Sequence, residues 1–188
     1  IDDIRYVLEA FRPLPGRLQL LRASNGALII NDCWTSSPES VAEAAAYFAK
    51  FDGQRKIVVL GEMEDLGGYA AEAHFEAGQQ MASAGAELLL ATGLHAGDIA
   101  SGAAAHSRTR VQTFPDARSI AGYLRTDRRP GDVVLFKAGR ESRFEQIISH
   151  VYHDKELTPL AGEPEWRRKK PKPGKLRDVR DSRKEGDG

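Results

Sequence analysis

One run of four apolar residues, Val133–Phe136, constrains the fold of this chain more than any other feature. A strand that is apolar on both faces is typical of a parallel sheet covered by helices, because neither face meets water. Two further β-rich runs, Lys56–Leu60 and Glu87–Ala91, are separated from it and from each other by segments with helical spacing. This alternation of strand and helix patterns predicts an α/β fold with a mostly parallel sheet.

The chain before these strands carries a different signal, an Asn-Gly pair between two apolar runs. Asn25-Gly26 lies between residues 17–21 and 27–30, and Asn-Gly in such a place is the strongest short hairpin signal. We therefore expect the first two strands to be antiparallel and to lie at the edge of the sheet. Together with four βα units they make a Rossmann-like three-layer sandwich with an antiparallel N-terminal hairpin.

Apolar residues spaced three and four apart predict the helices. The clearest case follows Pro38, which stands at a helix start behind Ser37 and precedes an apolar stripe that ends at Phe48. The expected helices cover residues 4–11, 38–48, 70–84, 96–105, 120–124 and 144–151, and a weaker strand covers residues 110–113.

The charges divide the chain into a domain over residues 1–158 and a basic tail over residues 159–188. Ten basic and six acidic residues lie between Glu163 and Gly188, with very few aliphatic residues to bury, so we expect this tail to be disordered. A basic tail can contact nucleic acid or anionic lipid. No aromatic interleaving or amphipathic period accompanies the charge, which favours a solvated extension and no nucleic-acid partner.

The sequence also indicates where the protein works. Its longest apolar runs, such as Leu88–Ala91, fall far short of the roughly 20 residues that span a bilayer, so no membrane span is expected. The chain begins at Ile1 with two acidic residues, which is the wrong charge for a signal peptide and suggests a piece of a longer protein. Cys33 is the only cysteine, which excludes an internal disulfide and favours the reducing cytoplasm.

The segments that follow the predicted strands are the candidate functional regions, because ligands of open α/β sheets bind beyond the carboxyl ends of the strands. Four segments qualify: residues 31–38, 61–68, 92–95 and 137–141. The chain contains no G-x-x-x-x-G-K-[ST], and no G-x-G-x-x-G follows a strand. It therefore carries no complete cradle for nucleotide phosphates.

Several of these segments resemble the C-terminal domain of Mur ligases, over about residues 1–152. Residues 58–67 (VVLGEMEDLG) are similar to the family's L-G-D-M-x-E-L-G, and residues 131–140 (GDVVLFKAGR) to its G-D-x-V-L-x-K-G-S-R. The beginning of the chain agrees from Phe11-Arg12-Pro13 onward. Where the family has D-x-Y-N-A-N-P, residues 32–38 (DCWTSSP) keep the acid, an aromatic residue and the proline but lack both asparagines.

The resemblance implies the C-terminal domain of an ATP-dependent amide ligase in peptidoglycan precursor synthesis, most like the members that add D-alanyl-D-alanine to a UDP-muramoyl-peptide. In that family a central domain, absent here, supplies the P-loop, binds most of ATP and Mg²⁺, and forms an acyl phosphate. The C-terminal domain closes over it and presents the incoming amine. This chain alone is then expected to be inactive and to work with the missing N-terminal and central domains.

The resemblance and the chemistry of the side chains together suggest two sets of binding residues. The first set, for the amine substrate, is Lys137, Arg140, Thr92 and His95; the second, for the nucleotide, is Asp32, Trp34 and Ser36. Cations can hold a carboxylate or offset phosphate charge, and a carboxylate can accept from ribose hydroxyls. No catalytic residue and no metal ligand are assigned.

Each candidate also has a purely structural interpretation. Asp32 can serve in an Asx turn before the helix, and Glu141 can neutralise Arg140. His74 fits a hydrogen-bonded histidine that supports the acidic loop 62–65. The alternative function is a non-catalytic α/β binding module that retains the Mur ligase C-terminal fold, which the lost asparagines would permit.

Overall fold

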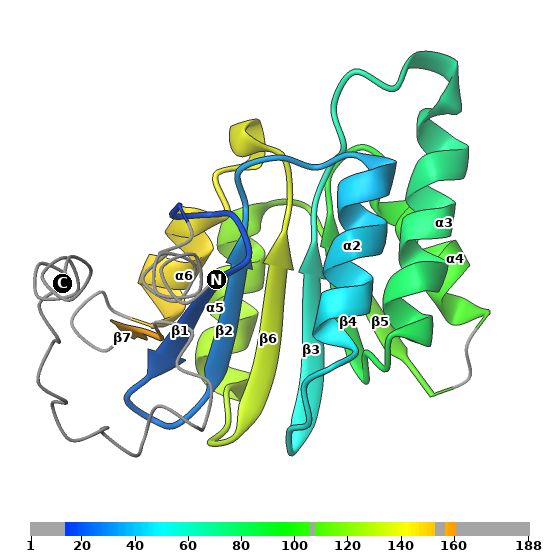
Figure 1. Ribbon diagram of the computed structural model, residues 1–188. Helices are drawn as coiled ribbons and strands as arrows, with labels where there is room; N and C mark the ends of the chain where they lie inside the picture. The colour runs from blue at the N-terminus through cyan, green and yellow to red at the C-terminus, as the bar shows by residue number, and fades with distance from the viewer. Residues whose placement is uncertain (1–13, 106–107, 153–156, 161–188) are drawn as a thin grey trace, which may run out of the picture.

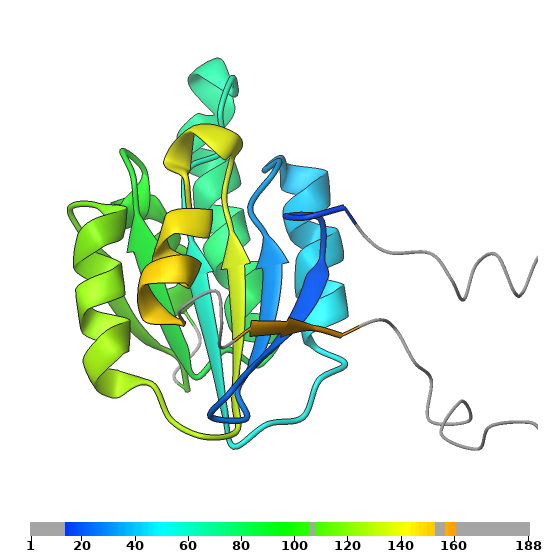
Figure 2. The same cartoon turned by 90° about the vertical axis from the view of Figure 1, so that its left-hand side faces the viewer.

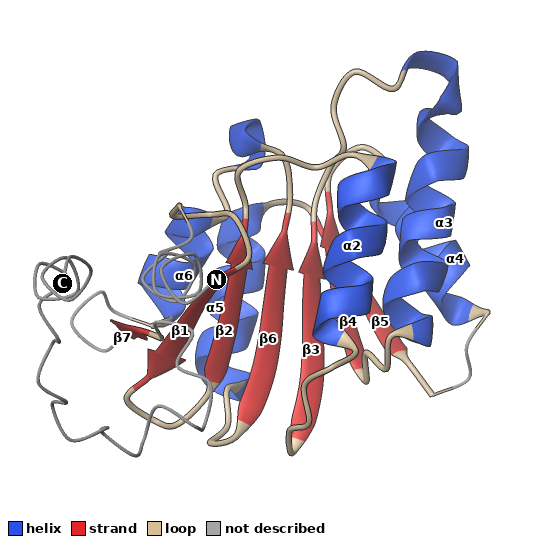
Figure 3. Ribbon diagram, in the orientation of Figure 1, coloured by secondary structure: helices blue, strands red, loops and turns tan. Residues whose placement is uncertain are grey.

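The computed structural model describes residues 14–105, 108–152 and 157–160. Within them a single mixed sheet lies between two layers of helices (Figures 1 and 3), as the alternating pattern predicts. The helix expected over residues 4–11 lies outside the described residues, and so does the chain from residue 161 onward.

Except for a short last strand, the described helices and strands follow the order expected from the sequence. The strands are β1 (Gln19–Ala23), β2 (Leu28–Asp32), β3 (Arg55–Leu60), β4 (Leu88–Thr92), β5 (Arg110–Phe114), β6 (Asp132–Lys137) and β7 (Leu157–Pro159). The helices are α2 (Pro38–Phe48), α3 (Ala70–Ser83), α4 (Ala96–Ala104), α5 (Ala117–Asp127) and α6 (Glu145–Val151), with 3₁₀ turns η1 (Gly67–Tyr69) and η2 (Arg140–Ser142).

The strand order is β5-β4-β3-β6-β2-β1-β7. The predicted hairpin of β1 and β2 is antiparallel, but β2 also pairs in parallel with β6, so β2 is an interior strand and not an edge strand as expected. Beside β1 the edge is formed by β7, a strand that the sequence does not predict. Three residues that include a proline carry too little pattern to reveal a strand, and β7 extends past the domain boundary predicted at residue 158.

Helices cover both faces of the sheet. Helices α2, α3 and α4 pack on one face, and α5 and α6 on the other (Figures 1 and 2). Every residue of β6 is buried, which confirms the interpretation of its apolar run. Two apolar clusters result, one on each side of the sheet.

Two glycines allow α3 and α4 to touch along their backbones. A Cβ atom on Gly78 would lie 2.1 Å from the carbonyl oxygen of Ile99, and one on Gly102 would lie 1.9 Å from that of Phe75. No other residue fits at either position. This close packing fixes α3 beside α4, with His74 in the first half of α3 and His95 directly before α4.

A buried network of ion pairs joins β3 to β6 at the N-terminal ends of these two parallel strands. The Arg55 guanidinium donates to both carboxylate oxygens of Asp132, at 3.0 and 2.8 Å, and to Asp127 at 2.7 Å. The hydrogen bonds that Arg55 donates to Asp132 raise the pKa of Arg55 above its ordinary value. Burial would raise the pKa of Asp127, but its bonds to Arg55 outweigh this effect and leave the pKa below its usual value.

We predict that Arg55→Met lowers the free energy of unfolding by about 3–5 kcal/mol, because it leaves Asp132 buried without its counter-charge. Asp132 is only 1% exposed. Urea unfolding followed by circular dichroism measures the loss, with Glu43→Gln on the exposed face of α2 as the control. A loss below about 0.5 kcal/mol, the range of ordinary surface substitutions, would contradict this account.

We also predict that a chain ending at Leu160 melts at the same temperature as the full chain, whereas a chain ending at Glu156 melts several degrees lower. The shorter chain lacks β7 and the hydrogen bond from the Leu160 amide to the Leu20 carbonyl, 2.9 Å long. A change of 1 kcal/mol moves the melting temperature by roughly 2–4 °C in a domain of this size. Equal melting of all three chains would show that β7 adds nothing to stability.

Candidate functional site

The loops after β2, β3, β4 and β6 gather at one edge of the sheet, at the top of Figure 1. After β3 the chain continues to β4 on one side, and after β6 it continues toward β7 on the other, so the topological switch point lies between β3 and β6. The two loops are joined there by hydrogen bonds from Gly61 to Lys137 and from Gly139 to Glu62, 2.9 and 3.2 Å long. This is where open α/β sheets bind ligands.

A buried ion pair lies at the ends of β2 and β6. Lys137 Nζ is 3.0 Å from Asp32 Oδ2, and the Lys137 side chain is fully buried. The same ammonium donates to the carbonyl of Thr35, and Asp32 Oδ1 accepts from the Leu18 amide at 3.0 Å. These contacts give Asp32 and Lys137 a structural role, whereas the ligand roles expected for them stay predictions.

A pocket of about 240 Å³ lies beside this ion pair. The Arg140 guanidinium stands over the Trp34 ring, 4.4 Å from its centroid, and Arg17 lies over the same ring at 6.0 Å. Both Arg140 and Trp34 are exposed. The lining residues are Pro15, Gly16, Asn31, Cys33, Trp34, Arg140 and Glu145.

Two buried side-chain oxygens within residues 31–36 have no hydrogen-bond partner within the described part of the chain. They are Asn31 Oδ1 and Ser36 Oγ. Asn31 is 8% exposed and lines the pocket, and its amide nitrogen donates to Gln19 at 3.2 Å. A buried oxygen without a donor is costly, so it marks a place where a ligand donor is favoured.

Cys33 lines the same pocket but is not a reactive thiol. It is 3% exposed, and its Sγ lies 3.5 Å from the Phe136 carbonyl oxygen. Burial, with the nearby charge of Asp32, raises the pKa of the Cys33 thiol far above its ordinary value. The residue fills space as a small apolar side chain, as its isolation in the sequence suggests.

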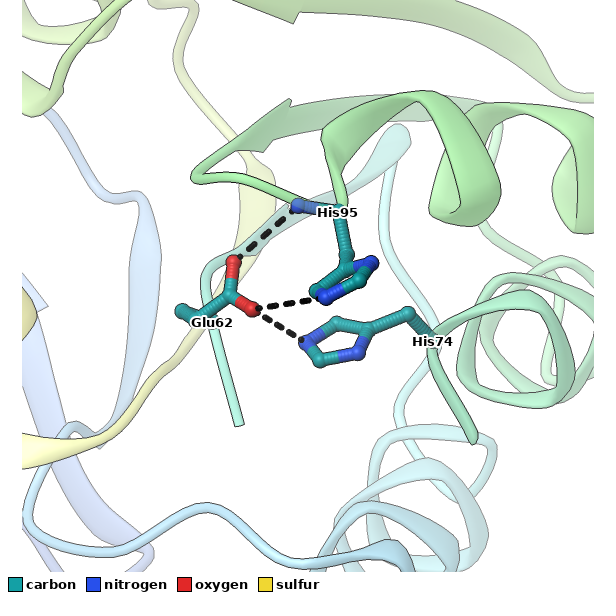
Figure 4. Close-up of side chains that lie close together, drawn as sticks. All are labelled: Glu62, His74 and His95. Carbon is teal, nitrogen blue, oxygen red and sulfur yellow. Dashed lines mark hydrogen bonds and ion pairs between the residues drawn. The ribbon is translucent and has the colours of Figure 1, made fainter. Parts of the chain in front are cut away.

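A second group of side chains lies on the other side of the β3 and β6 loops. His74 and His95 stack with ring centroids 4.7 Å apart, and the Glu62 carboxylate faces both rings (Figure 4). His74 Nε2 accepts a hydrogen bond from the Met63 amide at 2.8 Å, which confirms the predicted histidine support for the loop. The His95 amide donates to Glu62 at 3.2 Å.

The structure therefore divides the expected site residues among three places. Arg140, expected at the amine substrate, shares a pocket with Trp34, expected at the nucleotide. Lys137 is buried against Asp32. His95 lies in the cluster with Glu62, three residues after Thr92, which is buried at the end of β4.

Sequence reasoning missed Asn31 as a contributor to these sites, and it set Glu62 aside as one of several solvated charges in an acidic loop. Asn31 directly precedes Asp32, the residue expected to contact the nucleotide. That the Asn31 side-chain oxygen lacks a hydrogen-bond donor is known only from the structure. Glu62 stands in the loop that resembles the family motif, in the place of that motif's aspartate. Its position between two histidines depends on the packing of α3 against α4, which no local pattern shows.

No helix in the described ranges is both long and apolar enough to cross a membrane.

The structural role of the ion pair can be separated from a ligand role by stability alone. We predict that Asp32→Asn lowers the free energy of unfolding by about 3–5 kcal/mol, because the fully buried Lys137 ammonium loses its counter-charge. Arg140→Ala, at an exposed side chain, should change it by less than about 0.5 kcal/mol. Urea unfolding of both variants checks this. A small effect of Asp32→Asn would contradict the structural role and leave Asp32 available to bind a ligand.

Comparison with known proteins gives a consistent result. The family model for the Mur ligase glutamate ligase domain matches residues 16–140. The chain is 30% identical over 152 residues to the UDP-N-acetylmuramoyl-tripeptide–D-alanyl-D-alanine ligase of Bacillus subtilis. The aligned region covers 80% of this chain and 33% of that ligase. The ligase of the same name from Synechocystis is 28% identical over 138 residues, covering 72% and 30%.

Solved structures agree with this match. The MurF ligase of Thermotoga maritima in complex with ADP has 29% sequence identity and a TM-score of 0.64, covering 76% of this chain and 31% of that one. MurF from Acinetobacter baumannii, at 24% identity and a TM-score of 0.71, shares the fold and covers 80% and 33%. The chain thus spans about a third of the length of these relatives. It belongs to the Mur ligase family, whose glutamate ligase domain it contains.

Proposed function

We propose that this chain is the C-terminal domain of an ATP-dependent ligase that adds D-alanyl-D-alanine to a UDP-muramoyl-peptide in the cytoplasm. The names of its relatives support this, since they are UDP-N-acetylmuramoyl-tripeptide–D-alanyl-D-alanine ligases. Because the chain spans a third of their length, ligation would require the N-terminal and central domains of the same protein. The task of this domain is to hold the incoming amine.

The pocket formed by Trp34, Arg140 and Asn31 carries this proposal. A dipeptide with a free carboxylate and amide or ammonium N–H groups fits its chemistry. The Arg140 guanidinium can pair with the carboxylate through two parallel hydrogen bonds, and the buried, unpartnered Asn31 oxygen can accept from an N–H group once its side chain rotates toward the pocket. The Trp34 ring holds the guanidinium in place before the substrate arrives.

Amide formation needs the substrate amine next to the activated carboxyl group of the acceptor. ATP with Mg²⁺ would supply that activation. The residues of this domain would fix the dipeptide at its carboxylate end, so that the amine projects from the edge of the sheet toward the other domains. Orientation of this kind turns an encounter between two substrates into a step within one complex, and closure over the site excludes water.

The residues present fit only part of a nucleotide. The sequence lacks the G-x-x-x-x-G-K-[ST] cradle, and the charge of the buried Lys137 is already paired with Asp32. Trp34 is 41% exposed and offers a ring on which a base can stack, and the unpartnered Ser36 hydroxyl can bond to a ribose. Of the nucleotide, we therefore assign to this domain only the base and the ribose and not the phosphates. We expect the isolated chain to be inactive.

A second candidate function is an α/β binding module that takes no part in ligation. The internal pairing of Asp32 with Lys137 favours it, because it occupies two charged groups that the ligase hypothesis assigns to ligands. The two functions differ in what the complete protein does. Supplied with ATP, the UDP-muramoyl-peptide and D-alanyl-D-alanine, a ligase forms ADP, phosphate and the amide product, and a module does not.

In the complete ligase we predict that Arg140→Ala reduces kcat/KM for D-alanyl-D-alanine roughly ten- to a hundredfold, because a charge-assisted pair is worth about 1.5–3 kcal/mol. The KM for ATP should change little. Arg140→Lys should restore activity only in part, because an ammonium cannot form the two parallel bonds of a guanidinium. Steady-state kinetics with each substrate varied in turn measures these effects.

The matched control is Arg110→Ala, an exposed arginine at the start of β5 and therefore at the opposite end of the sheet. It should leave every kinetic constant unchanged. If Arg140→Ala raised the KM for ATP alone, Arg140 would be a nucleotide contact. If it changed neither constant, the pocket would not hold the amine substrate.

A further inference from the structure

We propose that Glu62, His74 and His95 form a binding site for a divalent transition metal ion of the Zn²⁺ type. The three side chains come from the loop after β3, from α3 and from the residue before α4 (Figure 4). One ligand atom of each lies within 4.8 Å of the other two. This site is separate from the Trp34 pocket and does not depend on the proposed ligase activity.

The spacing of the ligand atoms is close to that of a metal centre. Glu62 Oε1 is 3.4 Å from His74 Nε2 and 3.8 Å from His95 Nε2. In tetrahedral zinc sites, with bonds of about 2.0–2.2 Å to nitrogen and oxygen, neighbouring ligand atoms are about 3.3 Å apart. Because the two rings stack with an angle of 23° between their planes, one ring must tilt before both Nε2 atoms can point at one ion, and His95, the more exposed of the two, is the ring free to do so.

Both histidines have their second ring nitrogen fixed by an acceptor. His74 Nδ1 lies 2.7 Å from the Ala70 carbonyl oxygen, and His95 Nδ1 lies 2.8 Å from Asp98 Oδ2. Since these oxygens accept, Nδ1 is the donor in each ring and Nε2 is left as the ligand atom, close to Glu62 Oε1. Histidines that bind metals are oriented by this same arrangement, a carbonyl or carboxylate behind the ring.

Two Nε2 atoms and a carboxylate oxygen therefore lie close together in the described structure. The donors that reach them are two backbone amides, from Met63 to His74 Nε2 at 2.8 Å and from His95 to Glu62 at 3.2 Å. A cation between the three groups would offset their mutual repulsion. Because it would displace the Met63 amide from His74, we expect micromolar affinity and not the nanomolar affinity of a site with free ligands.

The ligand types select the metal. Two imidazoles and one carboxylate suit Zn²⁺, Co²⁺ and Ni²⁺, whereas Mg²⁺ prefers oxygen ligands alone. A fourth position is open to water, because Glu62 and His95 are 24% and 21% exposed and line a hollow of about 390 Å³. A bound ion would join the loop after β3 to both α3 and α4.

The test is titration of the 188-residue chain with Co²⁺, whose visible absorption reports tetrahedral coordination, followed by displacement with Zn²⁺. Calorimetry with Zn²⁺ gives the affinity. His95→Gln and Glu62→Gln should each weaken Zn²⁺ binding at least tenfold. His150→Gln, at an exposed histidine of α6 outside the cluster, is the matched control and should bind as the parent does.

Two further measurements complete the test. Asp98→Asn should weaken binding roughly ten- to a hundredfold, because it removes the carboxylate behind His95. A large excess of Mg²⁺ should not displace Co²⁺. Circular dichroism checks that each variant is folded. If Glu62→Gln does not fold, the Zn²⁺ affinity of His95→Gln, a change at a partly exposed side chain, tests the proposed site by itself.

The proposal is overturned if the chain binds no Zn²⁺ more tightly than about 1 mM, or if both ligand variants bind as the parent does. Equal binding by the variants would place the ion on other histidines of the chain.

Discussion

The candidate site depends on one buried ion pair, Lys137 with Asp32. Lys137 ends the central strand β6, between the ends of β2 and β3, and its ammonium has no contact with solvent. A charge in that place is tolerated only with a counter-charge and further hydrogen bonds, which Asp32 and the Thr35 carbonyl supply. The pair therefore fixes the loop after β2, and with it the position of Trp34.

The loops fixed in this way separate two kinds of chemistry at one edge of the sheet. Turn η2 presents consecutive residues to different regions, since Arg140 lines the Trp34 pocket and Glu141 lines the hollow that contains Glu62. One side is suited to an anion, the other to a cation. The edge can thus distinguish the two ends of a zwitterionic ligand or hold two separate ligands, and the kinetics and metal binding of the variants separate these cases.

Much of the fold follows from local patterns. The apolar run of β6, the Asn25-Gly26 turn and the helix behind Pro38 all predict the elements that form there. The position of β2 inside the sheet is not predicted, because pairing with β6 joins residues that lie about a hundred apart in the chain and leaves no local signal. Strand β7 is too short to reveal itself.

The candidate site is less predictable than the fold, for a physical reason. Residue type and place after a strand identified Arg140, Trp34 and His95, but hydrogen-bond partners decide which groups are available to a ligand. Lys137 is a cation in a family motif, and only its burial shows that its charge is used internally. Asn31 became a candidate through an oxygen without a partner, which only coordinates reveal.

The most direct test of the central claim is a crystal structure of the complete ligase with D-alanyl-D-alanine and a non-hydrolysable ATP analogue. The account predicts that the dipeptide carboxylate lies within hydrogen-bond distance of the Arg140 guanidinium, with an N–H group of the dipeptide directed at Asn31 Oδ1. A dipeptide whose carboxylate is bound elsewhere, with no contact to Arg140, would contradict it.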